Sequence, residues 1–244
     1  MTPAGEVSGR VKDKRQLGRA GSVNFEGIIF PHKAGGWEIV LNQDWELKGE
    51  AYNPARCYKR ENMVVITGVV QPKDRNFDNW QPLIGTLPVQ CRPSDGSLVF
   101  SVNSGDDAHE VEISQSGAIV WKSGNHRTRW LSLDGVAFLR STFNQLLLES
   151  PSWRSLSSVH PDLRYRTPGY GRLKRYCFLT GMILVEDIAN VSSTVAHLPA
   201  DECAPPVKVR FTVNNHDSVV GMTVPITFAL VLFSSYLCAP FCGS

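Results

Sequence analysis

Residues 110–121 read EVEISQSGAIVW, and this stretch decides the fold class. Apolar and polar residues alternate over residues 110–114, and the Gln-Ser-Gly that follows is typical of a turn before a second β-branched run. The stretch therefore predicts an antiparallel β-hairpin. Similar apolar runs at 63–70, 97–103 and 131–138, separated by turn residues, predict an all-β antiparallel sandwich or jelly-roll.

The hairpin belongs to a pattern that recurs along the chain. Residues 8–45 track residues 116–153 at a shift of 108, so that NFEGIIF at 24–30 stands where SLDGVAF stands at 132–138. On the other side, the segment 91–103 recurs at 203–214 with shifts of 111 and 112. Ordered matches on both flanks predict a β-sandwich-like module of about 110 residues in tandem copies.

These shifts predict one full copy and two complementary partial copies. The partial copies could close a second module within one chain, or between chains by a head-to-tail exchange. The expected layout is the C-terminal part of a module at 1–44, a complete module at 45–139, a linker or short helix at 140–152, the N-terminal part of a module at 153–217 and an uncharged apolar tail at 218–244.

The order of short motifs carries a family resemblance. LIGTLP at 83–88, Cys-Arg-Pro at 91–93 and WLSLDGVAF at 130–138 follow one another around strand-like runs. This order resembles the β-sandwich modules at the tips of phage tail fibres and baseplate proteins, and it is similar to tandem repeats in large dinoflagellate proteins. The resemblance implies binding or attachment, often to carbohydrate and often as a trimer.

The overall composition limits the classes of partner that we expect this chain to bind. The net charge is only +2, with 25 basic and 23 acidic residues interspersed, which argues against a nucleic-acid-binding protein. Residues 1–22 contain no apolar core of a secretory signal, and the localisation stays open. No charge follows Asp217, and Val219 to Leu237 is nearly long enough to span a bilayer. A membrane anchor, a buried strand pair and a gene-model artefact are the three alternatives.

We expect no catalytic residue, no cofactor and no metal site. The chain lacks a nucleophile elbow, a phosphate loop and a complete dinucleotide fingerprint. Asn103, Asp106, Asp107 and Glu110 could offer oxygen ligands to calcium, but a polar hairpin loop is the favoured interpretation. The neighbouring His109 is expected on the same surface loop.

Four cysteines allow two bridges by spacing, Cys57 with Cys91 and Cys177 with Cys203, yet buried free thiols are the favoured interpretation.

The tryptophans are candidates either for the core or for contact with a ligand. Trp45 and Trp153 recur in register, so we expect both in a core or between copies. The expected ligand contacts are Trp80, which lies in a polar loop, followed by Trp121, Arg127 and Trp130.

Together these features favour a non-enzymatic β-sandwich module for binding or adhesion, with a glycan or a protein surface as its ligand. The alternative is a structural subunit of a larger assembly or homo-oligomer, which the apolar tail could attach to a membrane.

Overall fold

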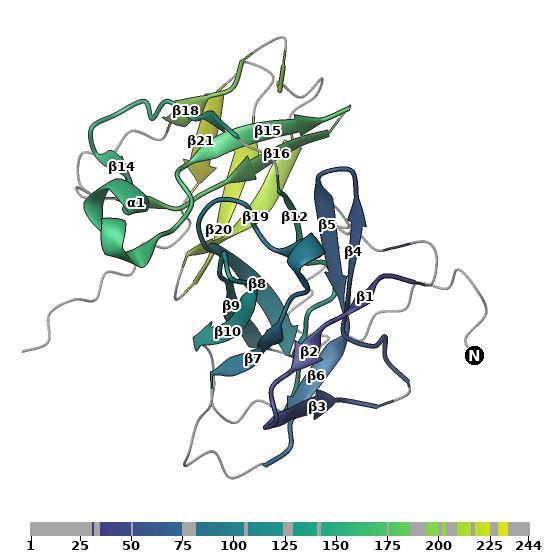
Figure 1. Ribbon diagram of the computed structural model, residues 1–244. Helices are drawn as coiled ribbons and strands as arrows, with labels where there is room; N and C mark the ends of the chain where they lie inside the picture. Colours follow the sequence, from purple (N-terminus) through teal and green to yellow (C-terminus); the bar gives the residue numbers. More distant parts are fainter. Residues whose placement is uncertain are drawn as a thin grey trace, which may run out of the picture.

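The expected all-β architecture is confirmed in the computed structural model, whose strands form antiparallel sheets. The structure describes residues 31, 35–49, 51–74, 82–104, 109–122, 129–140, 143–174, 176–185, 194–199 and 202–203, and the backbone alone at 107–108, 123, 209–215, 218–224 and 229–233. Two units follow one another along the chain: the first unit, β1 to β12, lies below the second unit, β13 to β21, in Figure 1.

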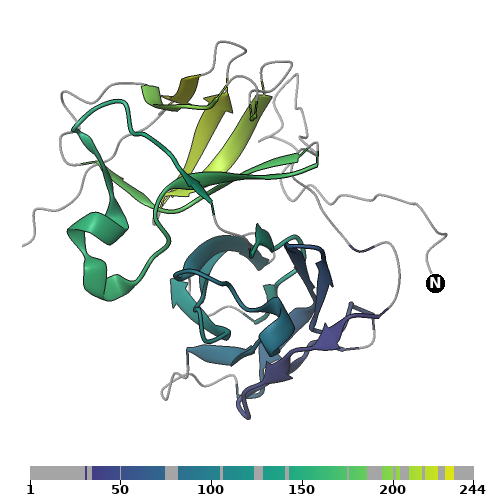
Figure 2. The same ribbon diagram turned by 45° about the horizontal axis from the view of Figure 1, so that its top comes forward.

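Two sheets surround the core of the first unit, which Figure 2 shows nearly end-on. One sheet has the strand order β1-β4-β5-β12, with bounds Trp37–Glu38, Arg56–Arg60, Met63–Thr67 and Ala137–Leu139. The other has the order β2-β7-β10-β9-β8-β11-β6-β3, with bounds Val40–Leu41, Leu83–Thr86, Ala118–Ser123, Asp107–Ile113, Leu98–Ser104, Leu131–Ser132, Val69–Pro72 and Trp45–Leu47. Its two end strands, β2 and β3, are joined in the sequence by residues 42–44 alone, which keeps them close together. This sheet is therefore nearly a closed barrel.

The chain crosses between the two sheets at Gly68. Strand β5 ends at Thr67 in the smaller sheet and β6 begins at Val69 in the larger one. Gly68 has φ +117°, and a Cβ there would lie 2.5 Å from Cα of Ala55. Its N–H donates to Oδ1 of Asp134 at 2.9 Å. A glycine is therefore required at this corner by both conformation and space.

Strands β9 and β10 form the predicted hairpin, and one face of this hairpin lines the core. Val111, Ile113, Ile119 and Trp121 are all 1% exposed or less, as a period of two requires. His109 shares that face, is also 1% exposed, and packs against the Trp121 ring with centroids 5.5 Å apart. The expectation of a surface loop for His109 is therefore wrong, because this residue lies within β9, two positions before Val111.

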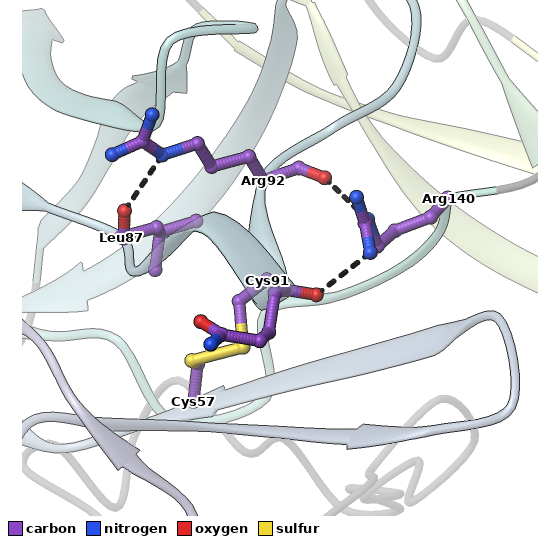
Figure 3. Close-up of a disulfide and its surroundings, with 6 residues drawn as sticks. Cys57, Leu87, Cys91, Arg92 and Arg140 are labelled. Atoms are coloured by element: carbon purple, nitrogen blue, oxygen red, sulfur yellow. Dashed lines mark hydrogen bonds between the residues drawn. A yellow bond between two sulfur atoms is a disulfide. The ribbon is translucent and has the colours of Figure 1, made fainter.

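The cysteines are paired, so the favoured free thiols are wrong. Cys57 of β4 bonds to Cys91 at the end of the short 3-10 helix η3 (Val89–Cys91), and both are fully buried (Figure 3). Cys177 bonds to Cys203 in the second unit. These are the two bridges that the spacing allows. The expected burial holds for Cys57, Cys91 and Cys203, whereas Cys177 is exposed. The guanidinium of Arg140 closes this turn by donating to the carbonyls of Gln90 and Arg92.

In the described part of the second unit, the strands form three sheets. They have the orders β13-β15-β16, β14-β17 and β18-β21-β20-β19. The respective bounds are Asn144–Gln145, Gly169–Leu173 and Tyr176–Thr180; Trp153–Ser155 and Ile183–Val185; and Thr194–His197, Ala229–Phe233, Ser218–Val224 and Val209–Asn215. A short helix α1 (Leu156–Val159) and a 3-10 turn η4 (Pro161–Leu163) connect β14 to β15.

Within 140–152, the expected linker or helix is replaced in part by strand β13. Phe143 lies against Gly171, where a Cβ would come within 2.8 Å of the Phe143 ring. Leu146 is 8% exposed and belongs to the core of the second unit together with Trp153. These apolar side chains face a sheet, so the segment is extended and pairs with β15.

Strand pairings in the two units correspond residue by residue. The register of β15 with β16 equals that of β4 with β5 at a shift of 113. The register of β19 with β20 equals that of β8 with β9 at a shift of 111. Strand β21 pairs with β20 and β18 as β10 pairs with β9 and β7. The second unit thus extends beyond residue 217, where the expected boundary lay.

The apolar segment after Asp217 contains the paired strands β20 and β21 at 218–224 and 229–233. Of the three alternatives for the tail, the strand pair is the one that the backbone shows for these residues. Among the residues that the structure describes, there is no helix with the length and apolar character needed to cross a membrane.

A buried arginine joins the two units. The Arg166 side chain of the second unit is 2% exposed, and its Nη2 lies 2.6 Å from Oδ1 of Asp95 in the first unit. Its guanidinium also donates to the carbonyls of Asp95 at 3.0 Å and Leu139 at 3.2 Å. Burial lowers the pKa of Arg166, and Asp95 opposes that shift. Backbone bonds between Ser97 and residues 164 and 166 extend the junction.

The first prediction concerns the corner between the sheets. We expect Gly68→Ala to lower the free energy of unfolding by about 1–3 kcal/mol more than Gly49→Ala does. Both glycines have a strongly positive φ, but nothing lies within 4 Å of a Cβ at Gly49. Urea denaturation of the two variants measures the difference. Equal losses would show that the contact with Ala55 is unimportant.

The second prediction concerns the junction. Arg166→Leu leaves the carbonyls of Asp95 and Leu139 without their donor, and we expect the free energy of unfolding to fall by about 2–4 kcal/mol. Arg164→Leu is the matched control, since Arg164 is an exposed arginine of the same loop. Denaturation followed by circular dichroism measures both, and a similar effect of the two substitutions would contradict the role of Arg166.

Candidate ligand-binding surface

The outer face of β3, β6 and β11 places polar and aromatic side chains side by side. Leu47 and Leu131 both stand opposite Val70, one on each side of β6. Val70 is fully buried, so the next residue, Gln71, points to the outer face. There its amide donates to Oε1 of Glu46 at 2.7 Å. Trp130 precedes Leu131 and therefore flanks this polar pair.

Lys48 joins two aromatic rings on this face. Its Nζ lies 3.8 Å from the ring centroid of Trp130 and 4.8 Å from that of Tyr52. A turn in which the Tyr52 N–H donates to the Gly49 carbonyl brings the tyrosine back over the lysine. Tyr52 is 45% exposed and Trp130 is half-buried. We refer to Lys48, Tyr52 and Trp130 as the Lys48 cluster.

The chemistry of the Lys48 cluster suits a ligand with both an apolar face and hydroxyl or acidic groups. Aromatic rings offer a flat apolar surface for the C–H face of a sugar ring or for an aliphatic side chain. The ammonium supplies three hydrogen-bond donors next to those rings. Cation–π attraction keeps the ammonium near the rings and so orders all three side chains before a ligand arrives.

Of the expected ligand contacts, Trp130 lies in this cluster. Trp121 does not: it is 1% exposed and packs edge-to-face against Trp45 in the core, so its expected contact with a ligand is wrong. The physical reason is the strand period, since Trp121 follows the buried Ile119 by two residues. Trp80 and Arg127 lie outside the described residues.

The segments that carry the other expected residues start at the same end of the sheet as Trp130. Strand β11 runs antiparallel to both β6 and β8. The last residues of β6 and β8 and the first residue of β11 therefore lie at the same end of the sheet. For the expected calcium alternative, Asp106 lies outside the described residues, whereas Glu110 is 7% exposed within β9. In the part of the chain that is described, no group of three or more metal-binding side chains occurs.

A hollow with a volume of about 470 Å³ lies in the second unit. Its hydroxyls bond to one another: Ser155 to Ser157 at 2.7 Å, and Ser157 to Thr167 at 3.2 Å. These hydrogen bonds satisfy hydroxyl groups of the lining within the protein itself. The loop that contains Thr167 also contains Arg166, which lies at the junction of the two units. The lining residues are Gln145, Leu146, Leu147, Leu148, Trp153, Arg154, Ser155, Ser157, Ser158, Thr167 and Pro168.

Sequence reasoning missed Lys48 and Tyr52. Neither stands in a motif, and their proximity to Trp130 arises from a register in which strands far apart in the chain meet on β6. The Lys-x-x-x-Tyr spacing around Gly49 is the one local signal, because a turn there brings the two side chains together. Trp130 was found because tryptophan is a frequent contact residue in binding sites.

Comparisons with known proteins give one likeness. No protein-family model and no curated protein matches the chain. The crystal structure of the receptor-binding protein of Listeria phage PSA is similar at 18% identity and a TM-score of 0.34. The match covers 43% of this chain and 64% of the phage protein, less than two thirds of its length. At these values the likeness carries no argument about function, and the resemblance to dinoflagellate repeats stays a prediction.

The third prediction tests whether the contact between Lys48 and Trp130 contributes to the free energy of unfolding. In a double-mutant cycle of Lys48→Ala and Trp130→Ala, we expect a coupling energy of about 0.5–1 kcal/mol, the range for an exposed cation–π pair. Urea denaturation of the four proteins supplies the values. A cycle that pairs Lys48→Ala with Trp37→Ala is the control, since Trp37 lies in the other sheet. Additive effects at Lys48 and Trp130 would contradict the contact.

Proposed function

We propose that the chain is a non-enzymatic binding module, whose first unit holds a carbohydrate ligand on the outer face around the Lys48 cluster. The observation that carries this proposal is the ammonium of Lys48 placed between the rings of Trp130 and Tyr52 at 3.8 and 4.8 Å. The exposed ring of Tyr52, the half-buried ring of Trp130 and the cation between them suit recognition of a sugar face and of its hydroxyl or acidic groups.

Rigidity of the underlying sheet supports the proposal. Lys48 directly follows β3 and Trp130 directly precedes β11, while Tyr52 lies in the turn after Lys48. Leu131 and Val70 below them are fully buried, and Trp45 is 3% exposed. Two of the three side chains are thus attached next to strands with a packed core, so ordering them costs little at the moment of binding. The Glu46–Gln71 pair extends the same face with a carboxylate acceptor and an amide for further sugar hydroxyls.

The fourth prediction is a binding experiment on the full chain. A glycan microarray identifies bound sugars, and titration by tryptophan fluorescence measures their affinity. We expect Trp130→Ala to weaken binding about tenfold or more, as loss of a stacked aromatic contact does. Trp37→Ala is the matched control because Trp37 is 42% exposed but lies in the smaller sheet.

Three outcomes would count against the proposal. One is that the titration shows no binding of the sugars that gave a signal on the array. Another is that Trp130→Ala and Trp37→Ala weaken binding equally. Either result would contradict a role of the Lys48 cluster in binding. Mass spectrometry of the recovered ligand tests the non-enzymatic part: a bound glycan returned with a broken or newly formed bond would make the chain an enzyme. A Trp80→Ala variant tests the remaining expected contact by the same titration.

A further inference from the structure

Lys48 differs from other basic side chains of the first unit and its junction in its partners. The contacts of its ammonium are the rings of Trp130 and Tyr52. The acidic residue of the preceding strand, Glu46, lies two positions earlier, and its carboxylate accepts from the Gln71 amide at 2.7 Å. Among the residues that the structure describes, no carboxylate forms an ion pair with Lys48, in contrast to the basic side chains of Arg56, Lys122, Arg166 and Lys174.

The two aromatic rings hold this ammonium without neutralising it. A ring attracts a cation through its quadrupole, which carries no net charge. Lys48 is half-buried, so its charge is partly withdrawn from water. Such a charge attracts an opposite charge more strongly than a fully hydrated lysine does. Within the described part of the chain, the Lys48 cluster therefore places one uncompensated positive charge next to an apolar surface.

The second unit shows that the strand pairing does not require this charge. The register of β14 with β17 equals that of β3 with β6, at shifts of 108 and 113 residues. The next backbone bond is also the same. The Lys48 N–H donates to the Val69 carbonyl at 3.0 Å, and the Leu156 N–H donates to the Met182 carbonyl at 3.0 Å. Because leucine occupies the equivalent position in the second unit, the ammonium of Lys48 is not needed to pair these strands.

We propose, on the basis of the function proposed above, that the sugar bound at the Lys48 cluster is anionic and that its carboxylate, sulfate or phosphate group pairs with the Lys48 ammonium. The ring of Tyr52 is 45% exposed, and the Lys48 Nζ lies 4.8 Å from its centroid. A sugar ring stacked on Tyr52 thus brings a charged substituent within reach of the ammonium. A lysine ammonium is a compact point charge with three rotatable donors, so it pairs with each of these anionic groups.

The fifth prediction compares charged sugars with their uncharged counterparts on the full chain. A glycan microarray that carries neutral, carboxylated, sulfated and phosphorylated sugars is expected to give its strongest signals with the anionic ones. Each bound anionic sugar is then titrated by tryptophan fluorescence beside its counterpart, which is the methyl ester of the carboxylate or the same sugar without its sulfate or phosphate. We expect the counterpart to bind about tenfold more weakly, because a charge-assisted hydrogen bond is lost.

Three variants separate the charge of Lys48 from the rest of the cluster. Lys48→Leu introduces the residue of the equivalent position in the second unit, and we expect it to bind the charged sugar no better than the counterpart. Lys48→Arg keeps the charge and the cation–π contact, and we expect it to keep the preference. Lys59→Leu is the matched control, because Lys59 is an exposed lysine of β4 in the smaller sheet. Circular dichroism verifies that each variant is folded.

The outcomes distinguish the anionic preference from the proposed function. If the charged sugar and its counterpart bind equally and Trp130→Ala weakens both, the anionic preference is wrong and the proposed function stands. A folded Lys48→Leu variant that retains the preference would also overturn it. So would equal loss of the preference in Lys59→Leu, since the attraction would then arise from the overall charge of the chain. A chain that binds no glycan contradicts both proposals.

Discussion

The guanidinium of Arg166 is the interaction on which the arrangement of the two units depends. Its side chain is 2% exposed, and a cation buried to this degree is stable only with its donors satisfied. Asp95 supplies the charge and is itself 45% exposed, so the pair is formed with one partner still hydrated. The ring of Phe143 lies 4.6 Å from the guanidinium and covers it from the other side. Because these directions are specific, the contact selects one orientation of the units more than it adds stability.

The same junction is coupled to the disulfide of the first unit through two consecutive residues. The Leu139 carbonyl accepts from Arg166, and the next side chain, Arg140, donates to the carbonyls of Gln90 and Arg92. That turn ends at Cys91, which is bonded to Cys57 in β4. Arg140 uses its planar donors on the carbonyls of the 3-10 turn, and Arg166 uses its donors on the carbonyls of Asp95 and of Leu139 at the end of β12. The end of β12 is thus connected at once to the disulfide-bonded turn and to the following unit.

Local periodicity predicted much of this fold, and its neglect explains two errors. Alternation around residues 110–121 predicted the β9–β10 hairpin, and the same alternation places His109 and Trp121 inside, although one was expected in a loop and the other at a ligand. Spacing named both disulfide pairs as possible but gave no reason to favour them over free thiols. The Lys48 cluster was beyond such reasoning. Cys57 meets Cys91, and Lys48 meets Trp130, through pairings between distant strands whose register depends on the whole sheet. Sequence spacing carries no information about such a register until the strand order is known.

The two units also show how one strand sequence serves two environments. Strand β5 reads MVVIT and β16 reads YCFLT, so both have apolar residues on both faces, as a strand covered on every side does. In β5 the cover is present and the side chains are buried. In β16 the same pattern is exposed within the described chain, with Tyr176 at 70%. An exposed edge under selection for solubility acquires charges, which β16 lacks from Tyr176 to Thr180. The sequence of β16 is therefore that of an interior strand, although Tyr176 and Leu179 are 70% and 38% exposed among the described residues.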